Sequence, residues 1–196
     1  MKRFDVIEHI IKMADPSRDA LVFANGRISR EACYLQDGDN HFYMLASMGQ
    51  APMIGLGLAM THPERRIIVI DGDGNLLMSL GALANVVGAN PRNFLHIVLD
   101  NQVYGTTGSQ QSLSRVVDLS AVAKASGYRN VVREQDDLAA AKKSLSTLLL
   151  REGPNFLLVQ VDQDDLQGTP PPQVEASVIR DRFRAWMASD VKQERA

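Results

Sequence analysis

Two kinds of hydrophobic pattern alternate along the chain. Apolar runs without polar alternation occur at 20–25, 66–71, 94–100 and 155–161. Such runs are typical of strands in a parallel sheet that is covered on both faces. Between them, apolar residues recur at helical spacing. This alternation predicts an α/β fold, a doubly wound parallel sheet with helices on both faces.

The other expected elements follow from the same two periods and from capping residues. An amphipathic helix is expected over 4–14, and Ser29, Ser47 and Asp118 are expected near the starts of three later helices, where their side chains cap free N–H groups. The later helices are expected at 30–36, 47–62, 76–89, 118–127, 136–152 and 179–186. Two further strands are expected at 41–45 and 128–134.

Length and composition fit one globular domain. The chain has 196 residues, of which 45% are hydrophobic, so one domain is expected over 1–187, with a frayed tail over 188–196. Residues 167–172 are expected to form an extended connector, because their prolines fix φ and remove N–H donors. The net charge of −2 gives no reason to expect a nucleic-acid partner.

Compartment is indicated by three simple features. The single cysteine, Cys33, cannot form an internal disulfide, which fits a reducing compartment. The first residues mix charges into their apolar positions, unlike a signal peptide. Apolar runs stay well below the roughly 20 residues that cross a bilayer. A cytoplasmic protein without a membrane partner is therefore expected.

Two loops rich in Asp, Asn and Gly follow two of the buried runs. Asp73 in "DGDGN" offers a carboxylate, and Asn101 in "DNQVYG" offers an amide oxygen 28 positions later, which fits one strand-helix-strand crossover. In an open parallel sheet, ligands bind beyond the carboxyl ends of the strands. Mg²⁺ prefers hard oxygen ligands and is usually shared with phosphate oxygens. The two loops together predict a magnesium-diphosphate site.

Each loop taken singly has an ordinary explanation. A GDG sequence is common in turns. It also invites a dinucleotide-binding interpretation, but that pattern needs a third glycine where the chain has Leu77. The pair of loops, correctly spaced and each after a buried strand, is more specific than either loop.

Glycines are expected to matter in two places. Gly49, Gly55 and Gly57 are expected to let the 47–62 helix pack closely. Gly72 and Gly74 are expected to let the backbone turn tightly and approach a phosphate, beside a helix whose free N–H groups point at that phosphate.

At these loops the sequence resembles the diphosphate-binding half of thiamine diphosphate enzymes, whose signature is GDG followed at a similar distance by NN or DN. The resemblance implies that the amides of Gly74 and Asn75 hold the diphosphate. The implied Mg²⁺ ligands are Asp73, Asn101 and the carbonyl of Val103. The implied cofactor-binding residues of these loops are Gly72, Asp73, Gly74, Asn75, Asn101, Val103, Tyr104 and Gly105.

The segment "ASMG" at 46–49 resembles a turn of the same family that contacts the aminopyrimidine ring. The resemblance implies that the Ala46 carbonyl accepts from the 4′-amino group, that Ser47 lies at the cofactor, and that Met48 is the apolar wedge beneath it. Ala46 stands where many relatives have glycine. Met48 has an alternative role in the core, because methionine fills irregular gaps.

Longer stretches resemble the β subunits of sulfopyruvate decarboxylases and the related phosphonopyruvate decarboxylases. These stretches are "FYMLASMG", "VIDGDGNLLMSLGALA" and "HIVLDNQVYGTTG". The resemblance implies a thiamine diphosphate- and Mg²⁺-dependent decarboxylation of a small anionic 2-oxo acid to an aldehyde and CO₂. It also implies an αβ hetero-oligomer, in which an α subunit carries the pyrimidine-binding domain and its catalytic glutamate.

Candidate substrate-binding residues are Arg30, Thr106 and Thr107. Arginine suits oxyanion recognition, and Arg30 is expected on a loop beyond the first strand, where its alternative role is a surface ion pair. The two threonines offer hydroxyl donors, or else they cap the loop, and Tyr104 has packing as its alternative role. His41 and His96 lie in apolar strands and are expected to be core histidines.

Two other functions stay open. One is a thiamine diphosphate carboligase that resembles acetolactate synthase, although such synthases normally carry both cofactor domains in one long chain. The other is a non-catalytic scaffold subunit, which the intact Asp73 and Asn101 argue against.

Overall fold

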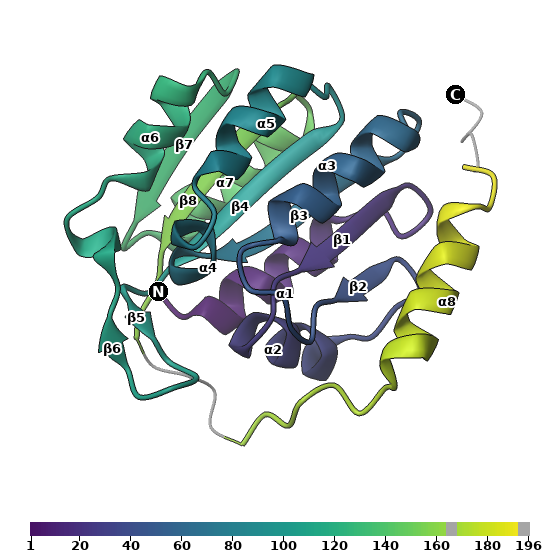
Figure 1. The fold of residues 1–196 in the computed structure, drawn as a ribbon, viewed down its shortest axis with the longest axis horizontal. Helices are drawn as coiled ribbons and strands as arrows, with labels where there is room; N and C mark the ends of the chain where they lie inside the picture. The colour runs from purple at the N-terminus through teal and green to yellow at the C-terminus, as the bar shows by residue number, and fades with distance from the viewer. Residues whose placement is uncertain (164–167, 192–196) are drawn as a thin grey trace.

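The computed structural model describes residues 1–163 and 168–191. Six parallel strands form the central sheet in the order β2-β1-β3-β4-β8-β7, and helices cover it on both sides (Figure 1). The predicted fold class is confirmed. The sheet strands are β1 Asp19–Phe23, β2 His41–Tyr43, β3 Arg66–Gly72, β4 Phe94–Asp100, β7 Asn130–Gln135 and β8 Asn155–Gln160. A separate hairpin pairs β5 Val103–Tyr104 with β6 Gln110–Gln111.

The helices are α1 Arg3–Met13, α2 Arg27–Leu35, α3 Ala51–Thr61, α4 Asp73–Leu77, α5 Gly81–Ala89, α6 Leu119–Ser126, α7 Leu138–Leu149 and α8 Ala176–Met187, with a 3₁₀ turn, η1, at Leu113–Arg115. The predicted cap at Asp118 is confirmed, because its carboxylate accepts from the amides of Ser120 and Ala121. Within the described ranges, no helix combines the length and the apolar character that crossing a membrane requires.

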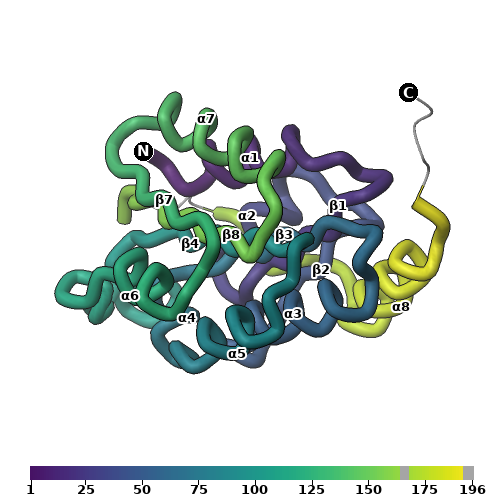
Figure 2. The backbone as a smooth tube through the Cα atoms, turned by 90° about the horizontal axis from the view of Figure 1, so that it is seen from above, coloured from purple at the N-terminus to yellow at the C-terminus, as the bar shows by residue number. Residues whose placement is uncertain are grey.

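The two faces of the sheet bury separate apolar clusters. On one face, Leu21 and Ile68 pack with α1, α2 and α7. On the other face, Val22 and Val69 pack with α3, α5 and α6. Figure 2 shows α1 and α7 above the sheet and α3, α5 and α6 below it. Because strand residues alternate between the two clusters, each run needs apolar residues at every position.

Ser29 is not a helix cap, contrary to the prediction. α2 already begins at Arg27, and the buried Ser29 hydroxyl lies 3.1, 2.8 and 3.1 Å from the carbonyl oxygens of Phe23, Ala24 and Met44. A hydroxyl inside the first turn therefore holds α2 against the ends of β1 and β2.

Two other helix predictions are wrong. Ser47 is no cap: its φ is +60°, its carbonyl accepts from the Gln50 amide at 3.1 Å, and α3 begins only at Ala51. The helix expected over 76–89 is two helices, α4 and α5, joined by a tight turn at 78–80. The segment contains no Pro and no polar cluster, and the isolated Ser79 and Gly81 at the break are tolerated in helices, so the sequence did not reveal it.

Both strand histidines are core residues, as predicted. His41 is buried with its Nδ1 3.0 Å from the Tyr43 hydroxyl, and burial lowers the pKa of His41 to about 4. His96 is fully buried between Asp71 and Tyr128.

The predictions for the C-terminal part of the chain can be compared with the structure only in part. The predicted connector begins at residue 167, outside the described residues, and Gly168 to Pro172 have no helix or strand. α8 ends at Met187, where the tail was expected to begin, and residues 192–196 of that tail lie outside the described residues. The single domain over 1–187 stays a prediction.

Gly55 is required by the packing of α3 on the sheet, whereas Gly57 is not. A Cβ at Gly55 would lie 2.2 Å from Val69 Cγ2 and 3.0 Å from Phe94 Cε2, while a Cβ at Gly57 meets no described atom within 4 Å. We expect Gly55→Ala to lower the free energy of unfolding by about 1–3 kcal/mol, because overpacking forces the backbone apart. The matched variant Gly57→Ala should leave it unchanged or raise it by up to about 1 kcal/mol. Urea denaturation measures both, and equal losses would contradict this account.

Candidate functional site

A cavity of about 80 Å³ lies beyond the carboxyl ends of β1, β3 and β4. β1 has β2 on one side and β3 on the other, so the order of the sheet changes direction between β1 and β3. Such switch points are where open α/β sheets bind ligands. From the predicted set, the cavity lining includes Met48, Gly72, Asp73, Gly74, Asn75, Asn101, Val103, Tyr104, Gly105 and Thr106.

The pairing of β3 with β4 brings the two predicted loops together. Gly72 is the register partner of Leu99, so Asp73 and Asn101 follow adjacent parallel strands at the same edge of the sheet. Both side chains are buried. The spacing of 28 positions is therefore one crossover between neighbouring strands, as expected.

Asp73 is a buried carboxylate in an acidic setting. Its residue is 2% exposed, and burial raises the pKa of Asp73 to about 6, with the nearby Asp100 adding to the rise. Burial also raises the pKa of Asp100. The Ser114 hydroxyl oxygen lies 3.0 Å from Asp73 Oδ2 and 2.8 Å from Asp100 Oδ1. A cation at this position would offset the cost of burying negative charge.

The oxygen atoms around Asp73 fit a hard divalent cation. The Asn101 amide oxygen accepts one long hydrogen bond, from the Val103 amide at 3.3 Å, and keeps a second lone pair. Asp73, Asn101 and Val103 line the same cavity. The described residues contain no group of three or more His, Cys, Asp or Glu side chains that suits a metal, so this candidate depends on amide and carbonyl oxygens. Such mixed oxygen sets are typical of Mg²⁺ sites completed by phosphate.

Of the two glycines in the GDG sequence, only one lies where a side chain would not fit. Neither has a positive φ, so the predicted tight turn does not depend on glycine. A Cβ at Gly74 would lie 2.4 Å from the Tyr104 ring, whereas a Cβ at Gly72 would meet only Ile28 Cδ1 at 3.6 Å. Gly74 therefore allows the close approach of Tyr104, which closes one side of the cavity.

The side chain of Asn75 fixes the turn that carries Met48, a role the sequence did not reveal. Its amide oxygen accepts from the Gly49 amide, and its amide nitrogen donates to Asp71 Oδ1. Gly49 has a φ of +90°, so this turn is held in a conformation that favours glycine. Asn75 thus links α4 to the turn across the cavity.

Asp71 in turn is held by its own buried partners. Its Oδ1 accepts from the Gly72 amide at 2.8 Å, and its Oδ2 lies 3.2 Å from His96 Nε2. His96 Nδ1 lies 3.3 Å from the Tyr128 hydroxyl. A buried polar chain therefore runs from Tyr128 to the Met48 turn, and a fully satisfied chain of this kind is rigid.

Asn75→Ala is expected to lower the free energy of unfolding by about 2–4 kcal/mol, because it leaves the buried Gly49 amide without its acceptor and removes one of the two hydrogen bonds to Asp71 Oδ1. Asn85→Ala is the matched control, since Asn85 is exposed on α5. Guanidinium denaturation of both variants measures the difference. Equal stability of the two variants would remove the proposed link between α4 and the turn.

Four predicted residues lie outside the cavity lining. Arg30 is on α2 rather than on a loop. The Thr107 hydroxyl lies 3.2 Å from the Tyr104 carbonyl and 2.7 Å from Gln110 Oε1, which matches its alternative role as a loop cap. Ala46 and Ser47 are exposed and line a neighbouring hollow beside β2 instead.

Two basic residues at the cavity are not among the residues predicted from the sequence. Arg27 and Arg3 line it. Arg3 forms a buried pair with Glu31 at 2.9 and 2.7 Å, so this acid does not pair with Arg30. Arg27 directly follows the first strand and "NG", a signal that could have placed it at the ligand end. Arg3 and Ser114 come from distant parts of the chain, and no local pattern marks them.

Comparison with known proteins gives a consistent result. The family model described as "Thiamine pyrophosphate enzyme, C-terminal TPP binding domain" matches residues 26–161. An enzyme from Mycobacterium smegmatis described as thiamin diphosphate-dependent has a similar fold, with a TM-score of 0.67 at 18% identity, covering 83% of this chain and 32% of that one.

Two relatives show how far the similarity extends. A phosphonopyruvate decarboxylase from Streptomyces viridochromogenes is 43% identical over 180 residues, or 90% of this chain and 44% of that protein. The sulfopyruvate decarboxylase subunit beta of Methanothermobacter thermautotrophicus is 41% identical over 184 residues, or 93% of this chain and 94% of that protein. The chain thus spans about half the length of the first relative and nearly all of the second.

Proposed function

The chain belongs to the thiamine pyrophosphate enzymes, through their C-terminal TPP-binding domain, and from this premise we propose that it is the diphosphate-binding chain of a 2-oxo acid decarboxylase. Its substrate is sulfopyruvate or phosphonopyruvate, and its products are CO₂ and an aldehyde. The observation that carries the proposal is the grouping of Asp73, Asn101 and Val103 around one cavity at the switch point of the sheet. The names of the relatives support the choice of reaction.

The positions of this chain's residues at the cavity support their proposed roles in binding. Asp73, Asn101 and the Val103 carbonyl hold Mg²⁺, and the amides of Gly74 and Asn75 hold the diphosphate. When bound, thiamine diphosphate supplies the electron sink that decarboxylation of a 2-oxo acid requires.

The residues around the reacting end have four further roles. Met48 supports the cofactor from the turn that Asn75 fixes, and the Ala46 carbonyl and Ser47 face its pyrimidine side. Tyr104 and Gly105 close the wall beyond Asn101, and Thr106 offers a hydroxyl donor to the substrate.

A partner chain completes the site in this proposal. Ala46, Ser47 and Met48 are exposed, as expected if their cofactor contacts lie between two chains. Relatives such as the phosphonopyruvate decarboxylases are about twice as long, and others are named as beta subunits. The partner is an α subunit that carries the pyrimidine-binding domain and its catalytic glutamate, in a cytoplasmic αβ hetero-oligomer.

Arg27 replaces Arg30 as the proposed contact to the substrate's oxyanion. Arg27 lines the cavity and Arg30 does not. Arg27→Gln is expected to lower kcat/KM at least about tenfold, mainly through KM, because a charge-assisted hydrogen bond to the anion is lost. Arg30→Gln, the matched control on the same helix, should stay within about threefold of the parent. Steady-state kinetics of the reconstituted enzyme measures both, and the reverse order would restore Arg30 to the site.

Product analysis tests the reaction itself. The reconstituted enzyme is incubated with sulfopyruvate or phosphonopyruvate, and CO₂ and the organic product are quantified. One aldehyde per CO₂ supports the decarboxylase, and the faster substrate identifies the oxyanion. A 2-hydroxyketone or a 2-hydroxy acid in place of the aldehyde would indicate a carboligase. Absence of turnover with both acids, despite cofactor binding, would contradict the proposed reaction.

A further inference from the structure

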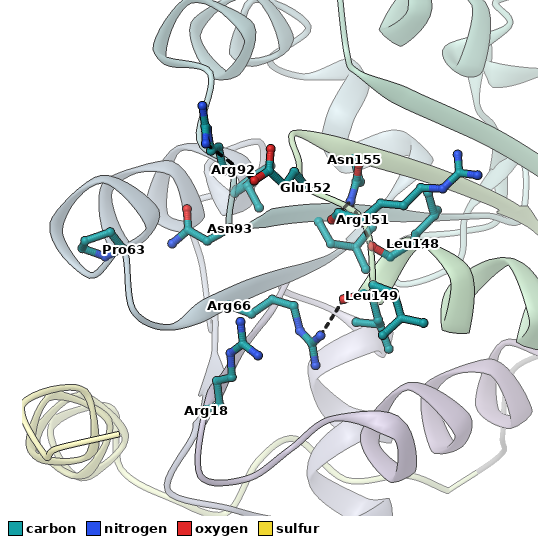
Figure 3. Close-up of a pocket in the computed structure, with 13 residues that line it drawn as sticks. Arg18, Pro63, Arg66, Arg92, Asn93, Leu148, Leu149, Arg151, Glu152 and Asn155 are labelled. Atoms are coloured by element: carbon teal, nitrogen blue, oxygen red, sulfur yellow. Dashed lines mark hydrogen bonds and ion pairs between the residues drawn. The ribbon is translucent and has the colours of Figure 1, made fainter. Parts of the chain in front are cut away.

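A second cavity, of about 260 Å³, lies at the opposite end of the sheet from the candidate site. It is lined by residues at the amino ends of three strands, including Arg66 of β3, Phe94 of β4 and Asn155 of β8. None of the residues implied in cofactor binding lines it. Figure 3 shows Arg92 and Asn93 on one side of the open space and Arg18 and Arg66 on the other.

The lining of this cavity has an excess of positive charge. It contains Arg18, Arg66, Arg92 and Arg151 but only one acid, Glu152. The Glu152 carboxylate contacts two arginines. Its oxygens lie 3.5 Å from Arg92 Nη1 and 3.7 Å from Arg129 Nη1, and Arg129 does not line the cavity. One carboxylate therefore serves two arginines and leaves the rim with unbalanced positive charge.

Arg66 is held in place as an anion-binding group requires. One of its terminal nitrogens donates to the Leu149 carbonyl at 2.7 Å, and the other pairs with Asp19. Its Nε is buried and has no hydrogen-bond partner among the described residues. A guanidinium that is already fixed by such contacts loses little conformational entropy when it contacts an anion.

The rest of the lining is suited to the organic part of a small ligand. Leu148, Leu149 and Phe94 give the cavity apolar surface. Asn93 is fixed, because its amide nitrogen lies 3.1 Å from the His62 carbonyl and 2.8 Å from the Arg65 carbonyl, which leaves its amide oxygen to accept from a hydroxyl. Small-molecule sites typically combine apolar surface with a small number of fixed polar groups.

We propose that this cavity binds a small organic anion that carries a phosphate or diphosphate group, at a site separate from the cofactor. Arg18 and Arg92 approach the charged group from opposite sides, and the fixed Arg66 lies at its base. The site requires neither Mg²⁺ nor a partner chain. It is therefore independent of the proposed decarboxylase activity and can fail or hold without it.

The test is a calorimetric titration of pyrophosphate, with inorganic phosphate as a second probe, into the chain at constant ionic strength in EDTA. EDTA suppresses Mg²⁺-dependent binding at the other end of the sheet. The fluorescence of Trp186, the only tryptophan in the sequence, is recorded in parallel, because its Nε1 donates to the Pro16 carbonyl on the loop that carries Arg18. Saturable binding of one pyrophosphate per chain, stronger than that of phosphate, is expected.

Paired variants locate the site. Arg18→Gln with Arg92→Gln should weaken pyrophosphate binding at least about tenfold. Arg180→Gln with Arg184→Gln removes the same charge from exposed positions on α8 and should leave binding unchanged. Arg92→Gln singly serves if the double variant does not fold, and its 73% exposed side chain makes it a mild change. Unchanged affinity in the Arg18 and Arg92 variants, or no saturable binding up to about 10 mM, would overturn the proposal.

Discussion

Replacing Asp73 with asparagine is expected to weaken Mg²⁺-dependent binding of thiamine diphosphate at least about 100-fold, because the site loses its single charged metal ligand. The Asp73 carboxylate is the only acid among the three proposed ligands, and it is buried at the cavity. Calorimetric titration of the cofactor in Mg²⁺ measures the loss. Asp181→Asn, a change of the same charge on exposed α8, should bind as the parent does. Unaltered affinity in Asp73→Asn would contradict the metal assignment.

The same substitution should leave the fold intact. Burial raises the pKa of Asp73 to about 6, above its value of about 3.9 in an unfolded chain. The folded state therefore holds the proton more tightly, and the stability from this group is lost as the pH rises from about 4 through about 6. Above pH 6, without a cation, Asp73→Asn should be at least as stable as the parent. Mg²⁺ binding to the parent should also weaken below pH 6, since the proton competes for the carboxylate.

Omitting the partner chain is expected to reduce CO₂ release at least about 100-fold. The proposed division of the site puts the pyrimidine-binding glutamate on the partner, and loss of an acid-base group typically costs a factor of about 100 to 10,000. Initial rates are measured at fixed concentration of this chain while the partner is titrated. The rate should rise to a plateau at a fixed ratio of the two chains.

The control for this prediction uses the same titration with Asp73→Asn in this chain. The rate of CO₂ release by that variant should not rise to the plateau of the parent even at excess partner, because the shared site then lacks its charged metal ligand. Turnover by this chain without its partner at the full rate would show that one chain completes the site, and it would contradict the two-chain proposal.

The fold could be predicted because the physical signal is local and repeated. Each buried run, such as 66–71 or 94–100, needs apolar residues on both faces of a parallel strand, and the structure has strands there. The predicted helix boundaries are wrong where tertiary contacts determine where a helix begins or ends. Ser29 looks like a cap in sequence, yet its hydroxyl is recruited by the ends of two strands. The break between α4 and α5 is marked only by Ser79 and Gly81, residues that helices also tolerate.

The sequence predicts those parts of the candidate site whose positions depend only on where the strands end. Asp73 and Asn101 follow two buried runs, so their position at one edge depends only on strand order, and the cavity brings them together. Side-chain direction was not accessible in the same way. Arg27 and Arg30 lie less than one helical turn apart at the start of α2, and of the two only Arg27 lines the cavity. Ser114 reaches Asp73 from 41 residues away.

The amount of thiamine diphosphate that this chain and its partner retain together through gel filtration, in Mg²⁺ and in EDTA, tests the magnesium-diphosphate site directly. We expect one cofactor for each copy of this chain in Mg²⁺ and almost none in EDTA. Retention that is equal in the two buffers, or absent from both, would contradict a magnesium-diphosphate site at Asp73 and Asn101.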